Sequence, residues 1–533
     1  MVGCKKVLIL LLVSSSGWAQ SDRYVVFFKD KTSNPYSLSQ PEAFLSPRSL
    51  QRRVHSGISL TAEDLPVTPS YVTQVRATGA KTFFTSKWMN GVLVEGNASM
   101  ISSIASLPFV TKVDLVAPGK KLIGGRSKQL NQQNAGSAPE TTQAQLQMLG
   151  LDKMHQDGFY GEGVTVSILD GGFPGVNLAL PFQPIFTEGR IKMTQDFVTN
   201  SGNVFQFDKH GTEVFSVIAA KQETFTGGAY KANYLLFVTE DASSEYRIEE
   251  YNWLFAAEKA DSAGTDVIQS SLGYNLFDDS QMDYKITDLN GKIAVVSRAA
   301  SMARDRGIIV VVSAGNVEPG RDWHFITPPA DVDGILAIGA VNSLGAKVGF
   351  SLFGPTADGR IKPDVVALGL STAVVLPDGT LSTDSGTSFS SPLVTSLVAG
   401  LLQAYSKYTP AQLVLAIRLS ASQSNTPDNK LGYGVPNYIA VKNYLEPNLL
   451  ADEVFIYPNP AASTLRLAFK NLPAGQVDIS FYDAQGKLLS NPVTTLNWLN
   501  NPEEISLTNL AAGSYFLKVK TATVIKTFRF VKL

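Results

Sequence analysis

The middle of the chain alternates short apolar runs with longer segments of helical spacing. Val164–Leu169 and Ile308–Val312 are mainly apolar runs, typical of strands that are buried on both faces of a sheet. From about Ser388 to Tyr405, apolar side chains recur every three or four residues, which predicts a buried helix. Strands that alternate with helices predict an α/β fold with a mostly parallel sheet. The apolar positions of the helix are Leu393, Val394, Leu397, Val398, Leu401 and Leu402.

A smaller unit of mixed elements precedes this region. Ser46–Pro47 predicts the start of a basic helix that runs to about His55, and Asn97 predicts the start of a second helix. Strands and helices mixed in this way predict a compact α+β module. The predicted strands are Tyr24–Phe28, Lys81–Phe84, Gly91–Glu95 and Val110–Val116.

The C-terminal part has the alternating pattern of short strands. The helical pattern stops after about Pro447, and turns such as Ala484–Lys487 separate the strands that follow. We expect a small all-β sandwich in this region. Its predicted strands include Val454–Tyr457, Thr464–Phe469 and Val477–Asp483.

The N-terminus has the pattern of a secretory signal peptide. Lys5–Lys6 precede the apolar run Val7–Val13, and small residues lead to Ala19, after which we expect cleavage. No apolar run in the chain reaches the roughly 18–20 residues of a membrane span. A polar stretch from Gly119 to about Gln143 separates the N-terminal module from the α/β region.

Length, charge and cysteine content limit the classes to which the chain can belong. At 533 residues it is too long for one typical core, so we expect several folded units. The 45 Lys and Arg residues balance 46 Asp and Glu residues, which argues against a nucleic-acid or anionic-membrane partner. Cys4, the only cysteine, lies in the predicted signal peptide, so we expect no disulfide in the mature chain.

Ser388 is the first candidate for chemistry. It lies in the small-residue run Asp384–Pro392 at the start of the predicted helix, where the helix dipole and free N–H groups favour a neighbouring oxyanion. An isolated serine at such a place is more often an N-cap. A nucleophilic serine also needs a general base, and the base needs a carboxylate that orients it.

A histidine and an aspartate occupy matching positions. Of the four histidines, His210 opens an apolar helical segment, whereas His55 and His324 lie in a basic segment and an aromatic loop, where we expect surface or packing roles. Asp170 follows the predicted strand Val164–Leu169 and so lies at its carboxyl end, where open α/β sheets build their sites. Taken alone, an aspartate before a glycine at this place is equally typical of a plain turn.

Together these segments resemble the subtilases, the family of subtilisin-like serine proteases. Asp170-Gly171-Gly172, His210-Gly211-Thr212 and Gly386-Thr387-Ser388 match the three family motifs, in the order Asp, His, Ser. The resemblance implies a doubly wound, mostly parallel sheet of the subtilisin type and a catalytic triad of Asp170, His210 and Ser388. It also implies hydrolysis of peptide bonds through an acyl-enzyme intermediate.

Two further segments resemble the oxyanion and substrate-binding parts of the family. Gly307–Asn316 is an apolar strand that ends in Gly-Asn, and the resemblance implies that Asn316 serves the oxyanion hole. Asp266–Gly273 ends in Ser271-Leu272-Gly273, and the resemblance implies that this segment pairs with an extended peptide. The alternative for Asn316 is an ordinary turn residue, and the alternative for Asp266–Gly273 is a plain sheet strand.

The chain departs from the usual family pattern at two places. Family members often carry a second histidine where Glu213 stands, and Met-Ala where Phe389–Ser390 stand. Neither change replaces a catalytic atom, so the departures bear on substrate range and loop packing. The chemistry requires no metal. Structural calcium occurs in relatives, but no segment here has the spacing of a calcium-binding loop.

The flanking units fit the same resemblance. In subtilases, the place of the N-terminal module is taken by a propeptide that assists folding and blocks the enzyme, which implies a maturation cleavage between Gly119 and Gln143. The segments Tyr457–Pro460, Asp483–Gly486 and Gly513–Lys532 resemble the C-terminal sorting domain of type IX secretion, which implies export across the outer membrane of a Gram-negative bacterium. The alternatives are a substrate-recognition domain at the N-terminus and an accessory carbohydrate- or protein-binding sandwich at the C-terminus.

We therefore predict a secreted or surface-associated serine endopeptidase that is made as a zymogen, cleaves proteins or peptides and is a monomer. Its expected partners are its own propeptide and the type IX secretion machinery. The rival hypothesis is a catalytically silent subtilase fold kept for adhesion or binding. A nucleotide-binding fold is disfavoured because Gly161–Gly163 precedes its strand instead of following it. The predicted parts are a signal peptide at 1–19, a propeptide and linker at 20–140, a protease domain at 141–446 and a sorting domain at 447–533.

Overall fold

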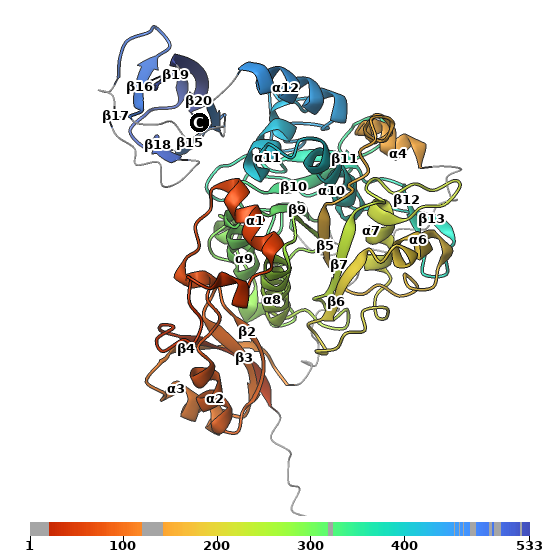
Figure 1. The fold of residues 1–533 in the computed structure, drawn as a ribbon, viewed down its shortest axis with the longest axis vertical. Coiled ribbons are helices and arrows are strands. Elements are labelled where there is room, and N and C mark those ends of the chain that lie inside the picture. The colour runs from red at the N-terminus through yellow and green to blue at the C-terminus, as the bar shows by residue number, and fades with distance from the viewer. Residues whose placement is uncertain are drawn as a thin grey trace, which may run out of the picture.

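The structure of the chain is a computed structural model with three folded parts (Figure 1). It describes residues 21–119, 142–317 and 323–451 without interruption. The predicted signal peptide at 1–19 lies outside the described residues, as do residues 120–141 of the predicted cleavage region from Gly119 to about Gln143. In the C-terminal part, the described residues are 454–457, 459–461, 463–469, 476–489, 493–494, 503–522 and 525–532.

A parallel sheet forms the centre of the large domain (Figure 1). Among the described residues it has seven strands in the order β11-β10-β9-β8-β5-β7-β6, and every neighbouring pair is parallel. The predicted doubly wound, mostly parallel sheet is confirmed. The strands are β5 (Thr165–Asp170), β6 (Ile191–Asp196), β7 (Asn233–Val238), β8 (Val267–Ser270), β9 (Ile309–Ser313), β10 (Leu336–Val341) and β11 (Val365–Leu368).

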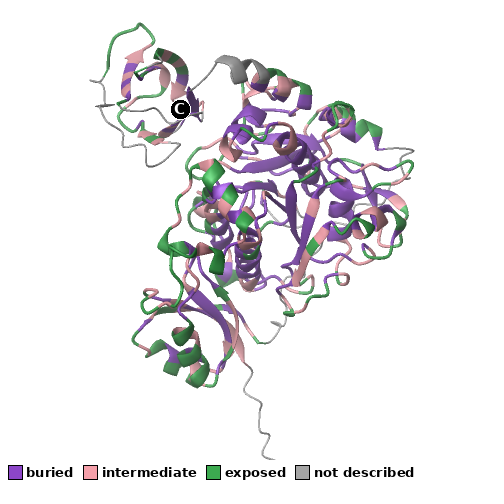
Figure 2. Cartoon of the chain, viewed as in Figure 1, coloured by how far each residue is buried: buried purple, intermediate pink, exposed green. Residues whose placement is uncertain are grey.

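Helices cover both faces of this sheet, which explains why most of its strands are largely apolar. Val166 and Ile168 of β5 pack into the apolar cluster that contains α7 and α10, whereas Leu169 packs into the cluster that contains α8 and α9. Every residue of β5 is buried, and Figure 2 shows the same for most of the sheet. These helices are α7 (His210–Ala219), α8 (Ile248–Ala263), α9 (Val295–Asp305) and α10 (Thr387–Ala404).

The sheet grows in both directions from β5. β7 and β6 extend it on one side, and β8 to β11 extend it on the other. The segments that follow the carboxyl ends of neighbouring parallel strands therefore meet at one edge, at a topological switch point. Asp170 ends β5, Ser271 follows β8 and Asn316 lies shortly after β9, so this edge collects several of the predicted site residues.

Shorter elements complete the large domain. α5 packs against both α10 and α12, and β12 and β13 form a separate two-stranded antiparallel sheet. None of the helices in the described part of the chain combines the length and apolar content that a membrane span requires. The elements are α4 (Gln143–Met148), α5 (Leu151–Gln156), α6 (Gln183–Thr187), β12 (Thr372–Val375), β13 (Leu381–Asp384), α11 (Pro410–Leu419) and α12 (Tyr438–Ala451).

The N-terminal module is a four-stranded antiparallel sheet in the order β2-β3-β1-β4. Val25 and Leu93 pack with α8 of the large domain, whereas Val26 and Val92 pack on the opposite face with α2 and α3. Successive side chains along these strands point to opposite faces of the sheet, so each face packs into a different apolar cluster. The elements are β1 (Asp22–Phe28), α1 (Pro47–Ser56), α2 (Pro69–Ala77), β2 (Lys81–Ser86), β3 (Gly91–Gly96), α3 (Ala98–Ala105) and β4 (Val110–Ala117).

Both predicted helix starts in this module are confirmed. The Ser46 side chain accepts a hydrogen bond from the Ser49 N–H at the start of α1, and the Asn97 side chain accepts one from the Met100 N–H at the start of α3. Helix α2 was not predicted. It buries Val75 alone, so its apolar periodicity is too weak to stand out in the sequence.

Buried charges join the N-terminal module to α8. The Asp261 carboxylate accepts hydrogen bonds from Arg52 Nη2 at 2.5 Å, Arg53 Nη2 at 3.0 Å and Lys87 Nζ at 2.9 Å. Burial raises the pKa of Asp261, but the three cations lower it more, so the pKa stays below its usual range. Glu258, one turn earlier, accepts the backbone N–H of Lys87 at 2.7 Å. The module is thus held by charge as well as by apolar packing.

The C-terminal part is the small all-β sandwich that the sequence predicts. One sheet has the order β14-β15-β18, and the other has the order β17-β16-β19-β20. Leu465, Ile479 and Leu517 belong to the apolar cluster between them. The strands are β14 (Val454–Tyr457), β15 (Thr464–Phe469), β16 (Asp478–Asp483), β17 (Val493–Thr494), β18 (Glu503–Ser506), β19 (Gly513–Lys520) and β20 (Ile525–Lys532).

The junction between the large domain and the sandwich differs from the prediction. Helix α12 continues to Ala451, so the predicted end of the helical part near Pro447 is wrong. A proline lacks one N–H donor and weakens a helix, but it does not always end it. The sandwich contacts the large domain through an ion pair at 3.3 Å between Arg466 and Asp333, and through Tyr457, which shares an apolar cluster with Leu415 of α11.

We expect Asp261→Asn to loosen the N-terminal module, because it leaves three buried cations without their common anion. Breaking a buried ion pair from one side costs about 3–5 kcal/mol. Urea unfolding of the full chain, followed by tryptophan fluorescence, measures the effect because the buried Trp88 lies in the same contact.

Asp305→Asn is the matched control. Asp305 pairs with Arg304 at 2.6 Å, but its side chain is 60% exposed, so its loss should change the unfolding free energy little. Equal effects of the two substitutions would contradict a special role for the buried ion pairs of Asp261.

Candidate active site

His210 is the first residue of α7, and Asp170 orients its ring. His210 Nδ1 lies 2.8 Å from Asp170 Oδ1. The aspartate is 1% exposed, and the Gly171 N–H donates to the same oxygen at 2.8 Å. Asp208 accepts the backbone N–H of His210 at 2.7 Å and so anchors the start of the helix. A carboxylate on Nδ1 selects the tautomer in which Nε2 can accept a proton.

Two glycines allow the backbones around Asp170 and His210 to approach closely. A Cβ atom on Gly211 would lie 2.2 Å from the carbonyl oxygen of Gly172. A Cβ atom on Gly172 would lie 2.2 Å from the carbonyl oxygen of Gln206. Both distances are far below van der Waals contact, so larger residues would push α7 away from β5.

Ser388 lies in the first turn of α10, next to His210. Ser388 is 7% exposed, and the ring of Phe389 lies 5.9 Å from the His210 ring, centroid to centroid. The hydroxyl Oγ donates to the carbonyl oxygen of Ser271 at 3.4 Å, and no hydrogen bond joins it to His210 in this conformation of the described residues. Hydrogen bonds between a nucleophile and its base are often loose without substrate.

Asn316 is oriented by the residue that precedes Ser388. Its Oδ1 accepts the Thr387 N–H at 2.9 Å and the Thr387 hydroxyl at 3.0 Å. Its Nδ2 lies 3.5 Å from the place that a Cβ atom on Gly386 would take. With the carbonyl end of the amide engaged in this way, the NH₂ end is the part that can donate to an oxyanion beside Ser388.

Ser271, Leu272 and Gly273 follow β8, and Ser271 contacts Ser388. The Ser271 hydroxyl donates to the Ser388 carbonyl oxygen at 2.8 Å. A Cβ atom on Gly273 would lie 2.1 Å from Thr327 Oγ1, so that position requires glycine. The segment Asp266–Gly273, which is expected to pair with a peptide, includes β8 itself. β8 pairs with β5 and β9 on its two sides, so only the segment beyond it is open to a peptide.

Gln269 is a site residue that the sequence analysis did not single out. It is fully buried in β8, and its amide donates to Ser271 Oγ at 2.9 Å and to Ser391 Oγ at 2.7 Å. The Thr395 hydroxyl donates to its carbonyl oxygen. Gln269 thus links the segment after β8 to α10, at two positions that follow Ser388 in that helix. A polar amide inside an otherwise apolar strand is the signal that could have indicated it.

Comparison with known families decides the affiliation. The family model described as the Subtilase family matches residues 161–434, which is just over half of the chain. The chain belongs to the subtilase family. The model of the peptidase S8 propeptide domain of Bacteroidota matches residues 23–135 of this subtilase, and that of the secretion system C-terminal sorting domain matches residues 455–532. All three resemblances predicted from the sequence are confirmed. The two flanking matches indicate a secreted or outer-surface location in Bacteroidota.

Individual relatives cover part of the subtilase. It is 29% identical to subtilisin NAT of Bacillus subtilis subsp. natto over 265 residues, which are 49% of this chain and 61% of that protein. It is 26% identical to subtilisin DY of Bacillus licheniformis over 284 residues, which are 53% of this chain and 92% of that protein. The solved structure of MycP1 with the N-terminal propeptide removed has a TM-score of 0.43 and 23% identity, and the match covers 56% of this chain and 96% of that one.

The electrostatic surroundings of His210 in this subtilase are strongly acidic. Burial lowers the pKa of the imidazole, but the charge and hydrogen bond of Asp170 raise it more. Asp208 and Glu213 add to the increase, and the pKa rises to about 9. The negative charges therefore favour the imidazolium form, so below about pH 9 the neutral ring, which is the form that can take a proton from a serine, is the minor form.

Glu213 takes the place of the histidine that many subtilases carry. It is buried, and Lys209 Nζ lies 2.6 Å from its Oε1. Burial raises the pKa of Glu213, and it also raises the pKa of Asp384 at the end of β13. Lys209 is the cation that offsets these carboxyl groups next to His210.

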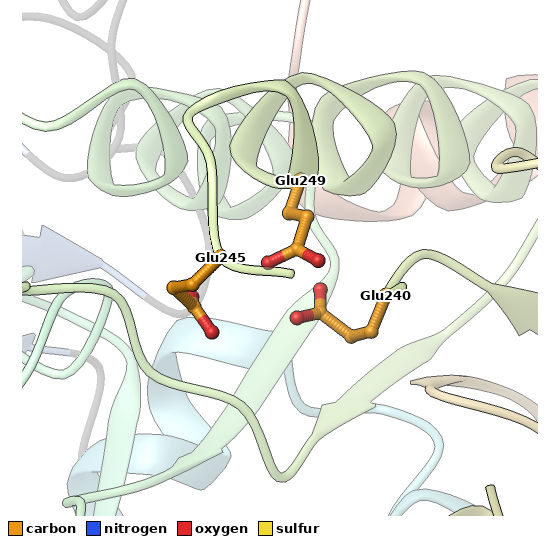
Figure 3. A group of neighbouring side chains, drawn as sticks. All are labelled: Glu240, Glu245 and Glu249. Atoms are coloured by element: carbon orange, nitrogen blue, oxygen red, sulfur yellow. The ribbon is translucent and has the colours of Figure 1, made fainter. Parts of the chain in front are cut away.

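Glu240, Glu245 and Glu249 form a separate acidic group. One carboxylate oxygen of each lies within 4.8 Å of the others, and all three residues are buried. Figure 3 shows the side chains pointing toward one another from the segment after β7 and from α8. The Tyr274 hydroxyl donates to Glu240 and connects this group to the residues that follow Gly273. Among the described residues this is the one group of three or more His, Cys, Asp or Glu side chains close enough together to share a metal ion, and divalent cations such as calcium prefer oxygen ligands.

We expect Gln269→Leu to destabilise the large domain, because it leaves the hydroxyls of Ser391 and Thr395 buried without their partner. A buried polar group that loses its hydrogen bond costs about 1–3 kcal/mol. Urea unfolding measures the change. Gln281→Leu, at an exposed position, is the control and should change little. An equally small effect at Gln269 would show that the network has no stabilising role.

We expect the His210 ring to titrate near pH 9, and Glu213→Gln to lower this midpoint because one negative charge is lost beside Lys209. Proton NMR of the Ser388→Ala protein measures both midpoints. The exposed Glu162→Gln is the control.

Because the folded pKa of His210 is raised above the unfolded value of about 6.5, this group stabilises the fold fully below pH 6.5 and loses that contribution as the pH rises to about 9. A wild-type midpoint near 6.5 would contradict the effect of the carboxylates.

Proposed function

We propose that this subtilase is a secreted serine endopeptidase that is made as a zymogen. The observation that carries the proposal is the 2.8 Å contact between Asp170 and His210 beside Ser388. Family membership and the two flanking domain matches support the same function. The chain covers 61% of the length of subtilisin NAT and of subtilisin E, so the proposed activity rests on the residues of this chain.

In the proposed reaction, Ser388 Oγ attacks the carbonyl carbon of a peptide bond. For this, Oγ exchanges its hydrogen bond to the Ser271 carbonyl for one to His210 Nε2, which takes the proton. Asp170 holds the ring and stabilises the imidazolium. The imidazolium then protonates the leaving amine, and water hydrolyses the acyl-enzyme by the reverse use of the same groups.

The proposed oxyanion hole consists of the Asn316 amide and the backbone N–H of Ser388. The bonds from Thr387 to Asn316 Oδ1 support this role, because they leave the NH₂ group as the donor. A donor that is already aimed when the charge develops costs no reorganisation, and such a donor is worth about 10²–10³-fold in kcat. The proposed peptide-binding segment is Ser271–Gly273, through its backbone groups.

The N-terminal module is proposed to block the site until it is cut away. Val116 and Ala117, at the end of β4, lie in the same apolar cluster as Leu272. The end of the module therefore packs on the side of the large domain that carries α8 and Leu272, which supports inhibition by the attached propeptide. The bond that is cut in maturation is proposed to lie between Gly119 and Gln143.

The remaining parts of the proposal concern partners and ions. The substrates are proteins or peptides, the sorting domain addresses the chain to the type IX secretion machinery, and the mature enzyme is a monomer. The triad mechanism uses no cofactor. Structural calcium is proposed as an accessory, and the group of Glu240, Glu245 and Glu249 offers the oxygen ligands for it.

Ser388→Ala tests the mechanism. We expect casein cleavage by the purified protein to fall at least about 10³-fold, and the N-terminal module to stay attached, because no other group supplies the nucleophile. Ser390→Ala is the matched control. Ser390 is buried in the same turn of α10, and its hydroxyl has no hydrogen-bond partner among the described residues, so its loss should leave cleavage intact.

A catalytically silent adhesin is the alternative, and the same experiment separates the two functions. Unchanged casein cleavage and unchanged loss of the N-terminal module in the Ser388→Ala protein would refute the triad. Absence of any cleavage by the wild type after removal of the module would favour the silent protein.

A further inference from the structure

Phe207, three residues before His210, has a backbone conformation that aromatic residues rarely adopt. Its φ is +72°, in the left-handed region. For a bulky side chain this value is an outlier, whereas small polar side chains tolerate it more readily. The other non-glycine residues with positive φ in the described part of the chain are all small and polar: Ser33, Asn90, Asn200 and Ser371.

Packing does not account for this conformation. Phe207 is 50% exposed, so its ring is not held in an apolar core. Glycine or asparagine would adopt the same backbone at lower cost. The exposed aromatic ring is the one feature that neither residue would supply. Backbone conformations of this kind persist mainly at sites that contact ligands.

The backbone of Phe207 is held between the aspartate motif, which contains Gly172, and the histidine motif, which begins at His210. It forms an isolated β-bridge with Gly172, two residues after Asp170. The next residue, Asp208, accepts the His210 N–H at 2.7 Å. The nearby Phe173 N–H donates to the Val204 carbonyl at 2.9 Å and holds the same loop down. Phe207 is therefore an exposed ring on a short segment anchored to both the aspartate motif and the histidine helix.

We propose that the Phe207 ring contacts the substrate residue next to the scissile bond and favours large apolar side chains there. The inference rests on the proposed function, because it assigns a specificity role at the same site. The ring and the substrate side chain cover each other from water, which is favourable in proportion to the apolar area that is buried. No charge or proton transfer is involved, so Phe207 affects binding and leaves the chemical step alone.

The test compares three substitutions in the full chain after processing. Phe207→Ala removes the ring and keeps the unfavourable backbone, Phe207→Gly removes the ring and relieves the backbone, and Phe207→Tyr keeps the ring. We expect the Ala and Gly proteins to lose about tenfold in kcat/KM, through KM, on peptides with Leu or Phe beside the scissile bond. Peptides with Gly or Ser at that position should be cleaved as by the wild type, and the Tyr protein should resemble the wild type throughout.

Stability separates a substrate contact from a structural role. Phe207→Gly should melt about 2–4 °C above Phe207→Ala, because glycine adopts a positive φ without strain. Asn200→Gly is the matched control, since it changes a residue with a φ of +60° at another position of the chain and should leave every kinetic constant unchanged.

Each outcome decides the proposal. An equal loss of kcat on all peptides would overturn it, because that pattern means that the loop only positions His210. Unchanged kcat/KM of the Gly protein on the Leu and Phe peptides would overturn it as well. If the wild type itself shows no cleavage that depends on Ser388, the proposed function fails, and this inference fails with it.

Discussion

The parallel pairing of β5 with β7 on one side and β8 on the other is the constraint on which the rest of the structure depends. Neighbouring parallel strands end at the same edge, so Asp170 and Ser271 come together without any contact specific to them. α7 begins at this edge because it connects β6 to β7 and must return across the face of the sheet. The start of α7 delivers His210, and the start of α10, which packs against the same face, delivers Ser388.

Two buried carboxylates, those of Asp261 and Asp170, have different kinds of partner. Asp261 is paired with two arginines and a lysine, and their positive charges keep its pKa below the usual range, so its carboxylate stays ionised and holds the N-terminal module by charge. Asp170 is paired with His210, whose pKa rises to about 9 and whose ring can therefore change its protonation state. The first pairing holds two folded units together, and the second holds a group that has to change its protonation state.

Local sequence patterns predicted the strands and helices around the site because each had one clear period. β5 is buried on both faces and reads as a continuous apolar run, and α1 and α3 begin at side chains that cap them. α2 escaped prediction because it buries one residue, and α12 continues past Pro447, near which the helical pattern was expected to stop. Gln269 was overlooked because its value depends on Ser391 and Thr395, more than a hundred residues away.

The sequence by itself determined the family, the order of its three motifs and the presence of a unit on each side, because motifs and apolar periods are local properties of the chain. It also indicated which residues would reach one edge of the sheet. Only the tertiary structure decided that β8 is an interior strand and that Thr387 binds the carbonyl oxygen of Asn316, which leaves the NH₂ group as the donor. It also decided that Asp261 faces three cations and that Phe207 is exposed in a left-handed conformation. These features arise from contacts between distant segments, and a period along the chain says which face is apolar but not which group will lie against it.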